Sequence, residues 1–207
     1  YKRDRFYFDL DPFEIDSLDS YNRSSISFPG VMYSANIFPS LREELRVQED
    51  NALGFKIDIP ETGYSLYGDK GHFYANNRLS LDKSGLRGEG KFDYLSSTTQ
   101  SDDYIFFPDS MNTHANTFNL ERVANIAEFP QVRGETIYEH WLPYDDFLMV
   151  EKKTDDLVLY SSEASLDGSI YLRPSGLTGS GNLSLEDSEL TSNLYYFNHN
   201  EFNADTA

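Results

Sequence analysis

A 91-residue internal duplication constrains this chain more than any other feature of its sequence. Residues 81–106 align with residues 172–197 without a gap, and ten of these 26 positions are identical. The shared template reads S-G-L-x-G-x-G, continues with an alternating segment, and closes with S-x-x-Y-x-F. Hydrophobic patterning alone does not keep three glycines at one spacing, so the sequence predicts a repeat architecture.

The glycines of the template predict places where one strand turns into the next. Glycine there supplies a positive φ or allows two backbones to approach closely. The six predicted turn glycines are Gly85, Gly88 and Gly90 in the first copy and Gly176, Gly179 and Gly181 in the second. A phosphate-binding loop would need a helix after the glycines, whereas an alternating segment follows here, so the turn interpretation is favoured.

The segments after the glycines alternate with a period of two. Phe92 and Tyr94 alternate with polar neighbours in the first copy, and Leu183 and Leu185 do so in the second. This period predicts strands with one buried face. Short strand-like segments also recur about every ten to thirteen residues over much of the chain. We therefore expect an all-β fold: an elongated antiparallel meander or solenoid-like sheet array with a glycine-hinged internal repeat.

One short helix and two repeat units are also expected. Ser40 and Glu43 have the spacing of a capping box, which predicts a helix near residues 41–48. Residues 1–138 are interpreted as the first β-repeat unit and residues 139–207 as the second. Because the second copy stops before its equivalent of the strand predicted at 117–120, we expect it to be truncated at its C-terminal end. The absence of an initiator Met or signal peptide suggests an excised segment.

Charge and composition argue against several classes of partner. Thirty-five acidic residues outnumber 17 Lys and Arg, for a formal net charge of -18. Such a field repels phosphate backbones, so we expect no nucleic-acid partner. There is no cysteine, which excludes disulfides and thiolate chemistry. No apolar stretch approaches the roughly 18 residues of a membrane-spanning helix, so the chain is not predicted to be transmembrane.

No pattern in the sequence indicates catalysis. None of the four histidines lies in a zinc-binding spacing such as H-E-x-x-H, and no G-x-S-x-G elbow is present. Adjacent carboxylates such as Asp102 and Asp103 would point to opposite faces of a strand, which weakens them as a catalytic pair. We therefore predict a protein that is not an enzyme and carries no cofactor or metal.

The densest aromatic and acidic cluster, at residues 138–146, is the best candidate binding site. A flat ring flanked by hydrogen-bond acceptors is what a sugar-stacking platform requires. The candidate platform comprises Trp141 with Tyr138, Tyr144, Asp145 and Asp146. The alternative is that Trp141, the only Trp, fills the core, where aromatic side chains are already abundant.

The texture of the repeats resembles large, uncharacterised exported proteins of Bacteroidota. The resemblance rests on G-Y-S-L-Y-G-D-K-G, S-G-L-R-G-E-G and F-F-P-D-S-M, and it implies an extracytoplasmic location at the cell surface or in the periplasm. Three Asp-Ser/Thr-apolar triplets resemble the O-glycosylation sites of such proteins, with acceptors at Ser17, Ser110 and Thr206. The G-x-L-x-L texture also resembles AsmA/TamB-like envelope proteins, whose curved sheets carry lipid.

Three functions follow from these observations as open hypotheses. The first is a structural or adhesive repeat segment, whose partners are other repeats of the same chain or envelope and surface proteins. The second is a lipid-conducting groove, which requires a uniformly apolar concave face with polar residues such as Ser80 and Asp93 opposite it. The third is a carbohydrate-binding module, which requires Trp141 to be exposed in a cleft.

Overall fold

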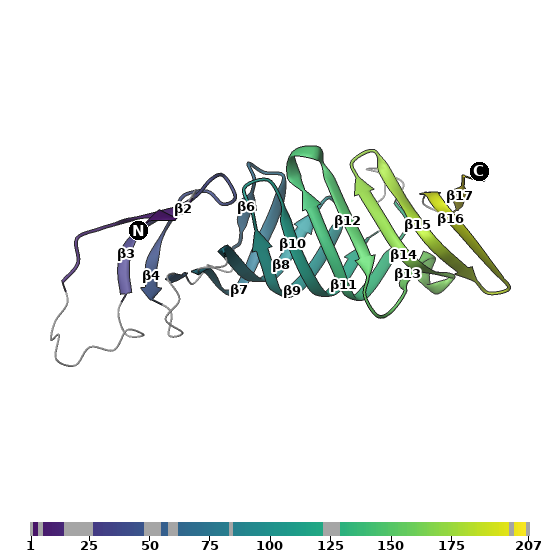
Figure 1. The fold of residues 1–207 in the computed structure, drawn as a ribbon, viewed down its shortest axis with the longest axis horizontal. Helices are drawn as coiled ribbons and strands as arrows, with labels where there is room; N and C mark the ends of the chain where they lie inside the picture. The colour runs from purple at the N-terminus through teal and green to yellow at the C-terminus, as the bar shows by residue number, and fades with distance from the viewer. Residues whose placement is uncertain are drawn as a thin grey trace.

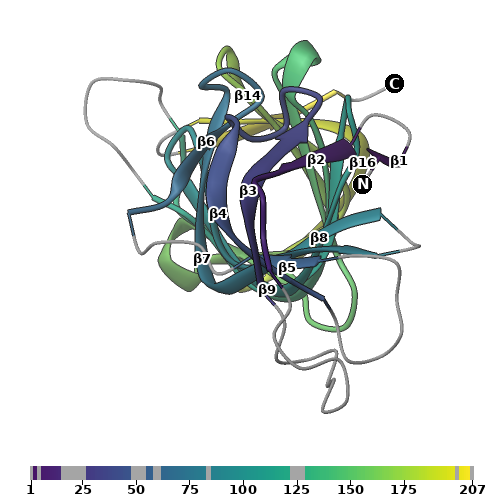
Figure 2. The same cartoon turned by 90° about the vertical axis from the view of Figure 1, so that its left-hand side faces the viewer.

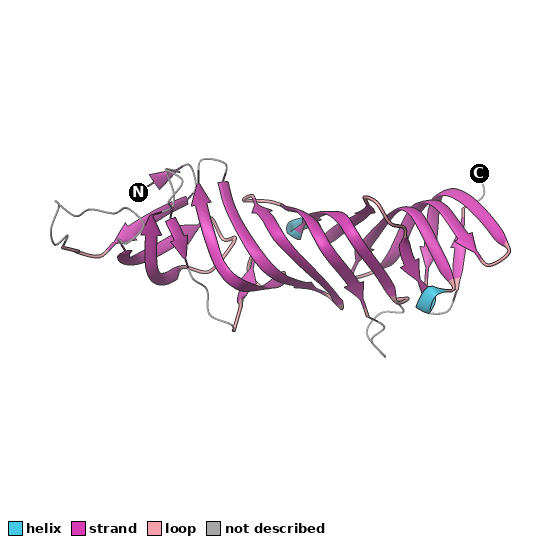
Figure 3. Ribbon diagram, turned by 90° about the horizontal axis from the view of Figure 1, so that it is seen from below, coloured by secondary structure: helices cyan, strands magenta, loops and turns pink. Residues whose placement is uncertain are grey.

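Strands make up nearly all the regular structure of the chain (Figure 3). The computed structural model describes residues 2–3, 6–14, 27–47, 55–57, 62–82, 85–121, 129–198 and 201–205. Within these ranges the helical segments are two short 3-10 helices, η3 (Pro143–Asp145) and η4 (Tyr160–Ser162). None of the described helices is long and apolar enough to cross a membrane.

The seventeen strands within the described residues belong to one antiparallel sheet. The strands before the first template glycine are β1 (Lys2–Arg3), β2 (Phe6–Leu10), β3 (Ser27–Ser34), β4 (Leu41–Val47), β5 (Phe55–Ile57), β6 (Tyr64–Leu66) and β7 (Gly71–Asp82). The central strands are β8 (Gly85–Tyr94), β9 (Ser97–Phe106), β10 (Met111–Leu120), β11 (Val132–Leu142), β12 (Phe147–Lys152) and β13 (Leu157–Leu159). The last strands are β14 (Ala164–Arg173), β15 (Gly176–Leu185), β16 (Ser188–Phe197) and β17 (Phe202–Ala204).

The sheet is a meander in which neighbouring strands pair in the order of the chain. This order is interrupted at two places, and at each of them two short strands share one position in the sheet. β12 and β13 both lie between β11 and β14. In the same way, β5 and β6 both pair with β7. The prediction of an all-β antiparallel meander is therefore confirmed.

The sheet coils around its long axis and encloses its own core. Figure 1 shows the elongated molecule with its two termini toward opposite ends, and Figure 2 shows the strands encircling that axis. Along β8 every second residue is buried, from Leu86 to Tyr94, which is the pattern of a strand with one enclosed face. The buried side chains form one continuous cluster from Phe8 to Phe197. Aromatic rings fill much of this interior, including those of Phe73, Phe92 and Trp141.

The pairing order of β4 to β10 recurs in β11 to β17. In the first set, β4 is followed by the short strands β5 and β6, which share one position in the sheet, and then by β7 to β10 in succession. In the second set, β11 is followed by the short strands β12 and β13, which share one position, and then by β14 to β17. The junction between the two sets lies between β10 and β11. The predicted boundary at 138/139 instead falls inside β11, which pairs with β10 on one side and β12 on the other. The sheet therefore continues through that boundary.

The helix predicted near residues 41–48 is wrong, because residues 41–47 form strand β4. This strand pairs with β3 over six positions, from Ser27–Arg46 to Met32–Leu41, and then with β5. The apolar positions 41, 45 and 47 are all odd-numbered, so they also fit a period of two. The β3 ladder supplies β4 with backbone hydrogen bonds that a capping box between Ser40 and Glu43 could not outweigh.

Candidate functional site

A bulge of the same form lies in each of the two strand pairs that carry the duplicated template. In both, two residues of the second strand lie opposite one residue of the first. The pairs on either side of the bulge are Gly88–Tyr104 and Gly90–Ser101 in β8–β9, and Gly179–Tyr195 and Gly181–Ser192 in β15–β16. A bulge bends a strand and increases its local twist, so it helps the sheet to coil.

Most of the predicted turn glycines lie within strands, at these bulges. Gly85 and Gly176 open β8 and β15, but the other four lie inside the strands, so their assignment to turns is wrong. The second bulge shows why glycine is required. Gly181 has a φ of 135°, and a Cβ there would lie 2.3 Å from the carbonyl oxygen of Asp167. A Cβ on Gly179 would lie 2.8 Å from the ring of Phe197.

The template serine closes each bulge through its hydroxyl group. Ser101 Oγ donates to the carbonyl oxygen of His114 on the next strand and accepts from the N–H of Asp103, both at 3.0 Å. The second copy repeats both contacts: Ser192 Oγ donates to Asp205 O at 3.2 Å and accepts from Leu194 N at 3.1 Å. Each of the three residues in the second copy, Ser192, Leu194 and Asp205, follows its counterpart in the first copy by 91 positions. The serine therefore satisfies backbone groups that the bulge leaves without ladder partners.

The template tyrosine and phenylalanine complete the same arrangement. Tyr104 Oη donates to the carbonyl oxygen of Thr99 at 3.0 Å. Tyr195 donates in the same way to the carbonyl oxygen of Leu190. The following phenylalanine stacks beside each tyrosine, with ring centroids 6.0 Å apart for Tyr104–Phe106 and 5.6 Å apart for Tyr195–Phe197. The motif S-x-x-Y-x-F therefore encodes a bulge with its hydrogen-bond partners.

Two further tyrosines connect turns that are distant in the sequence; we call these contacts the tyrosine clasps. Tyr67 Oη donates to the carbonyl oxygens of Phe107 and Ser110 in the β9–β10 turn, each 2.7 Å away. Tyr160 Oη donates to Glu201 O in the β16–β17 turn at 2.6 Å. Glu201 follows Ser110 by 91 residues, so both clasps hold equivalent turns. Burial raises the pKa of both tyrosines, which keeps their hydroxyls protonated as donors.

Trp141 lies in the core, so the predicted sugar-stacking platform is wrong. Its side chain has no exposed surface. The indole contacts Phe92 and Tyr94 of β8 and Tyr67 of the β6–β7 turn, with ring centroids 4.7, 5.4 and 5.3 Å away. These three rings cover the indole ring of Trp141, so no face of it is available for a sugar to stack on. The alternative of a core tryptophan agrees with the structure.

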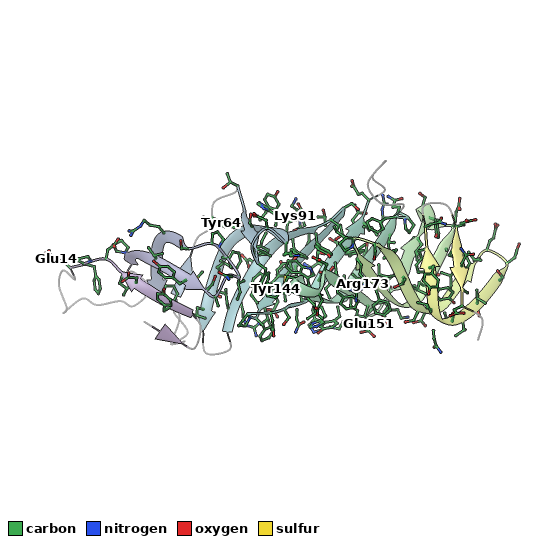
Figure 4. All side chains as sticks on the ribbon, turned by 90° about the horizontal axis from the view of Figure 1, so that it is seen from above. Glu14, Tyr64, Lys91, Tyr144, Glu151 and Arg173 are labelled. Atoms are coloured by element: carbon green, nitrogen blue, oxygen red, sulfur yellow. The ribbon has the colours of Figure 1, made fainter. Side chains whose placement is uncertain are left out.

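The other residues of the predicted platform lie apart from the Trp141 ring. Tyr138 is on the outer face of β11, where its ring lies 5.2 Å from that of His114. Tyr144 is 55% exposed and is labelled midway along the molecule in Figure 4. Asp145 accepts a hydrogen bond from Arg173 through its backbone oxygen, and Asp146 forms an ion pair with Lys70 at 2.9 Å. These contacts connect neighbouring turns and leave no shared stacking face.

Glu139 is an ionisable residue that is fully buried in the core, and the sequence analysis did not single it out. It lies on the inner face of β11, where its ladder partners are Thr113 and Val150. Its Oε1 accepts a hydrogen bond of 2.6 Å from Thr99 Oγ1. Its Oε2 is buried and has no hydrogen-bond partner among the described residues. The signal available in the sequence was only its position, two residues before Trp141 on the same face.

Burial controls the protonation of the Glu139 carboxyl group and of the neighbouring Tyr104 hydroxyl. Loss of solvation raises the pKa of Glu139 to about 8, and the hydrogen bond from Thr99 opposes that rise. Burial also raises the pKa of Tyr104 well above its usual range, and the negative charge on Glu139 adds to the effect. Because the Glu139 side chain is fully buried, its protonation bears on the stability of the fold.

The remaining predicted sites fall on turns or outside the described residues. Ser110, a predicted O-glycosylation acceptor, lies in the β9–β10 turn, and its hydroxyl donates to Asp109 at 3.2 Å. Ser17 and Thr206, the other two acceptors, lie outside the described residues. Within the described part of the chain, no three His, Asp or Glu residues are placed to hold a metal ion.

The tyrosine clasps were also missed by sequence reasoning. Tyr67 and Tyr160 differ by 93 positions rather than 91, so a gap-free alignment does not superimpose them. Both have a positive φ, 48° for Tyr67 and 52° for Tyr160, which no side-chain pattern reveals. Comparisons of this chain with protein-family models, with curated proteins and with solved structures each found no match.

Proposed function

We propose that this chain is a non-enzymatic structural segment of a large exported surface protein, in which a coiled sheet is extended by tandem units. The observation that carries the proposal is the recurrence of one set of contacts. The bulge, the serine and tyrosine hydrogen bonds and the tyrosine clasp occur between the β6–β7 turn and β10, and again between η4 and β17. A unit that contacts chiefly its neighbours can be repeated to build length without a new core.

The solvent-facing side of the sheet supports a role in a surface environment. The chain carries a formal net charge of -18, and its described ion pairs, such as Lys152 with Asp156 and Asp167, lie on exposed or half-exposed side chains. A highly charged outer face keeps an elongated protein solvated and resists non-specific association. Other repeats of the same chain, or envelope and surface proteins, are the proposed partners.

The inner face weighs against a lipid-conducting groove. Ser80 and Asp93 do share the outer face, as a lipid groove would require. However, the inner face also carries Thr99, Thr113 and Glu139, and the aromatic rings of β7–β11 pack against one another across it. An acyl chain would have to displace these side chains, so the lipid hypothesis is the weaker one.

Surface exposure can be tested on intact cells that produce the protein. Cells are treated with an external protease, and the segment is detected with antibodies raised against residues 1–207. We expect cleavage of the protein while a periplasmic marker stays intact. Protection until the outer membrane is permeabilised would contradict a surface role. Stoichiometric lipid in the purified chain, measured by mass spectrometry, would instead favour the lipid groove.

A further inference from the structure

The first copy carries a polar cluster inside its largely aromatic core; we call it the Glu139 cluster. Its members are Glu139 on β11, Thr113 on β10 and Thr99 on β9, and all three side chains are buried. Thr113 is the ladder partner of Glu139, so their side chains lie next to each other on the inner face. Thr99 is connected to Glu139 by the 2.6 Å hydrogen bond between its Oγ1 and Oε1. Three strands therefore bring polar groups to one place in the core.

The shape of the sheet does not require this cluster. In the second copy, Leu190 and Ala204 occupy the positions of Thr99 and Thr113. The bulge and the tyrosine hydrogen bond are nevertheless the same in both copies. Burying a polar side chain costs free energy unless the side chain is hydrogen-bonded. The two threonines of the first copy therefore have a role that the apolar pair of the second copy lacks.

The hydroxyl protons of both threonines are already used in hydrogen bonds within the chain. Thr99 Oγ1 donates to Glu139 Oε1. Thr113 Oγ1 lies 2.6 Å from Ser101 Oγ and 3.0 Å from the carbonyl oxygen of Asp103, and it donates its proton to one of them. A hydroxyl oxygen that donates its proton keeps lone pairs with which it can accept. Both threonines are therefore available to a further group only as acceptors.

The carboxyl group of Glu139 has one oxygen that the rest of the chain leaves unsatisfied. Oε1 accepts from Thr99, so a proton on this carboxyl lies on Oε2. Burial raises the pKa of the group to about 8, and Oε2 is therefore a hydrogen-bond donor at neutral pH. No acceptor among the described residues lies within hydrogen-bond distance of Oε2. Buried polar atoms of this kind are typical partners of ordered internal water.

We propose that the Glu139 cluster binds a single buried water molecule, held by Glu139 Oε2, Thr99 Oγ1 and Thr113 Oγ1. The water accepts the proton of Oε2 and donates one of its own protons to each threonine oxygen. Buried waters typically make about three such hydrogen bonds, so this donor and these two acceptors complete its coordination. The inference goes beyond the proposed structural role and does not depend on where the protein resides.

A high-resolution crystal structure of the chain of residues 1–207 tests the site directly. We expect ordered density about 2.5–3.0 Å from Glu139 Oε2 and from both threonine oxygens. Contact of Oε2 with a protein acceptor, without such density, would overturn the proposal. Magnetic relaxation dispersion of ¹⁷O-labelled water provides the measurement in solution, because it counts water molecules that stay bound for longer than the protein takes to tumble.

Variants of the chain assign the counted water to the cluster. Glu139→Gln keeps an acceptor for Thr99 and a donor for the water, so the count should equal that of the parent chain. Glu139→Leu removes both groups and should lose a single long-lived water, and Thr113→Val should lose the same water with the carboxyl still in place. Thr117→Val, at an exposed threonine of the same strand, is the matched control and should keep the count. An unchanged count in Thr113→Val or in folded Glu139→Leu would overturn the proposal.

Discussion

The strand pairs β8–β9 and β15–β16 share their backbone irregularity but differ in what packs against it. Both have the bulge, the serine contacts and the tyrosine hydrogen bond. Inside the first, Phe92 and Tyr94 face Trp141, whereas the second presents Leu183 and Leu185 at the corresponding positions. The template therefore holds the shape of the sheet, and the residues between its fixed positions decide how the interior is filled.

The largest expected effect comes from removing the ring that fills the first region. Trp141→Ala should lower the free energy of unfolding by about 3–5 kcal/mol, because it leaves a cavity among Phe92, Tyr94 and Tyr67. Urea unfolding followed by circular dichroism measures the change. Tyr144→Ala, at an exposed ring in the neighbouring turn, is the control and should cost less than about 1 kcal/mol. Similar losses for the two variants would contradict a buried Trp141.

The second effect is a pH dependence that arises beside the first region, where Thr99 of β9 donates a hydrogen bond to the buried Glu139 of β11. The pKa of Glu139 is about 8 in the folded chain against an ordinary value of 4.5, so the folded state binds more protons between these values. The free energy of unfolding should therefore fall as pH rises from 4.5 to 8, by roughly 3–5 kcal/mol at most, and then level off.

Glu139→Gln tests this pH dependence, because it keeps an acceptor for Thr99 and cannot ionise. Chemical unfolding of both proteins at several pH values between 5 and 9 provides the comparison. We expect the variant to lose less stability than the parent chain over this range. Parallel curves for the two proteins would show that Glu139 does not titrate in the folded state within it.

A third, smaller effect should separate a bulge glycine from a turn glycine. Gly181→Ala places a Cβ against the carbonyl oxygen of Asp167 at a φ of 135°, and should cost about 2 kcal/mol or more. Gly68→Ala, at a φ of 68° with open space around it, should cost about 1 kcal/mol. Thermal unfolding of the two variants measures both. A smaller loss for Gly181→Ala would mean that the bulge can relax.

The smallest effect tests whether the two copies of the tyrosine contact are equivalent. Tyr104→Phe and Tyr195→Phe each remove one hydrogen bond to a backbone carbonyl oxygen, and each should cost about 1 kcal/mol. Both rings stay in place, so packing changes little. Urea unfolding curves of the two variants should shift by similar amounts. A loss confined to Tyr104→Phe would show that only the first copy depends on the contact.

The strands were more predictable than the contacts between them. The alternation of Phe92 and Tyr94 with polar residues is a local signal, and it correctly predicted β8. The segment at 41–47 carries apolar positions that suit a helix or a strand, and only pairing with β3 decides between them. Trp141 has neighbours in sequence that suit a surface platform, but its contacts are with β8 and the β6–β7 turn.

The sequence by itself determined the all-β class and the positions of the template residues, because period-two alternation and glycine spacing are local properties of a chain. Only the tertiary structure placed those glycines in bulges, buried Trp141 and brought Thr99 to Glu139 across 40 residues. The physical reason is the coiling of the sheet. It sets which inner faces meet, and therefore which side chains lose solvent and which polar groups need partners.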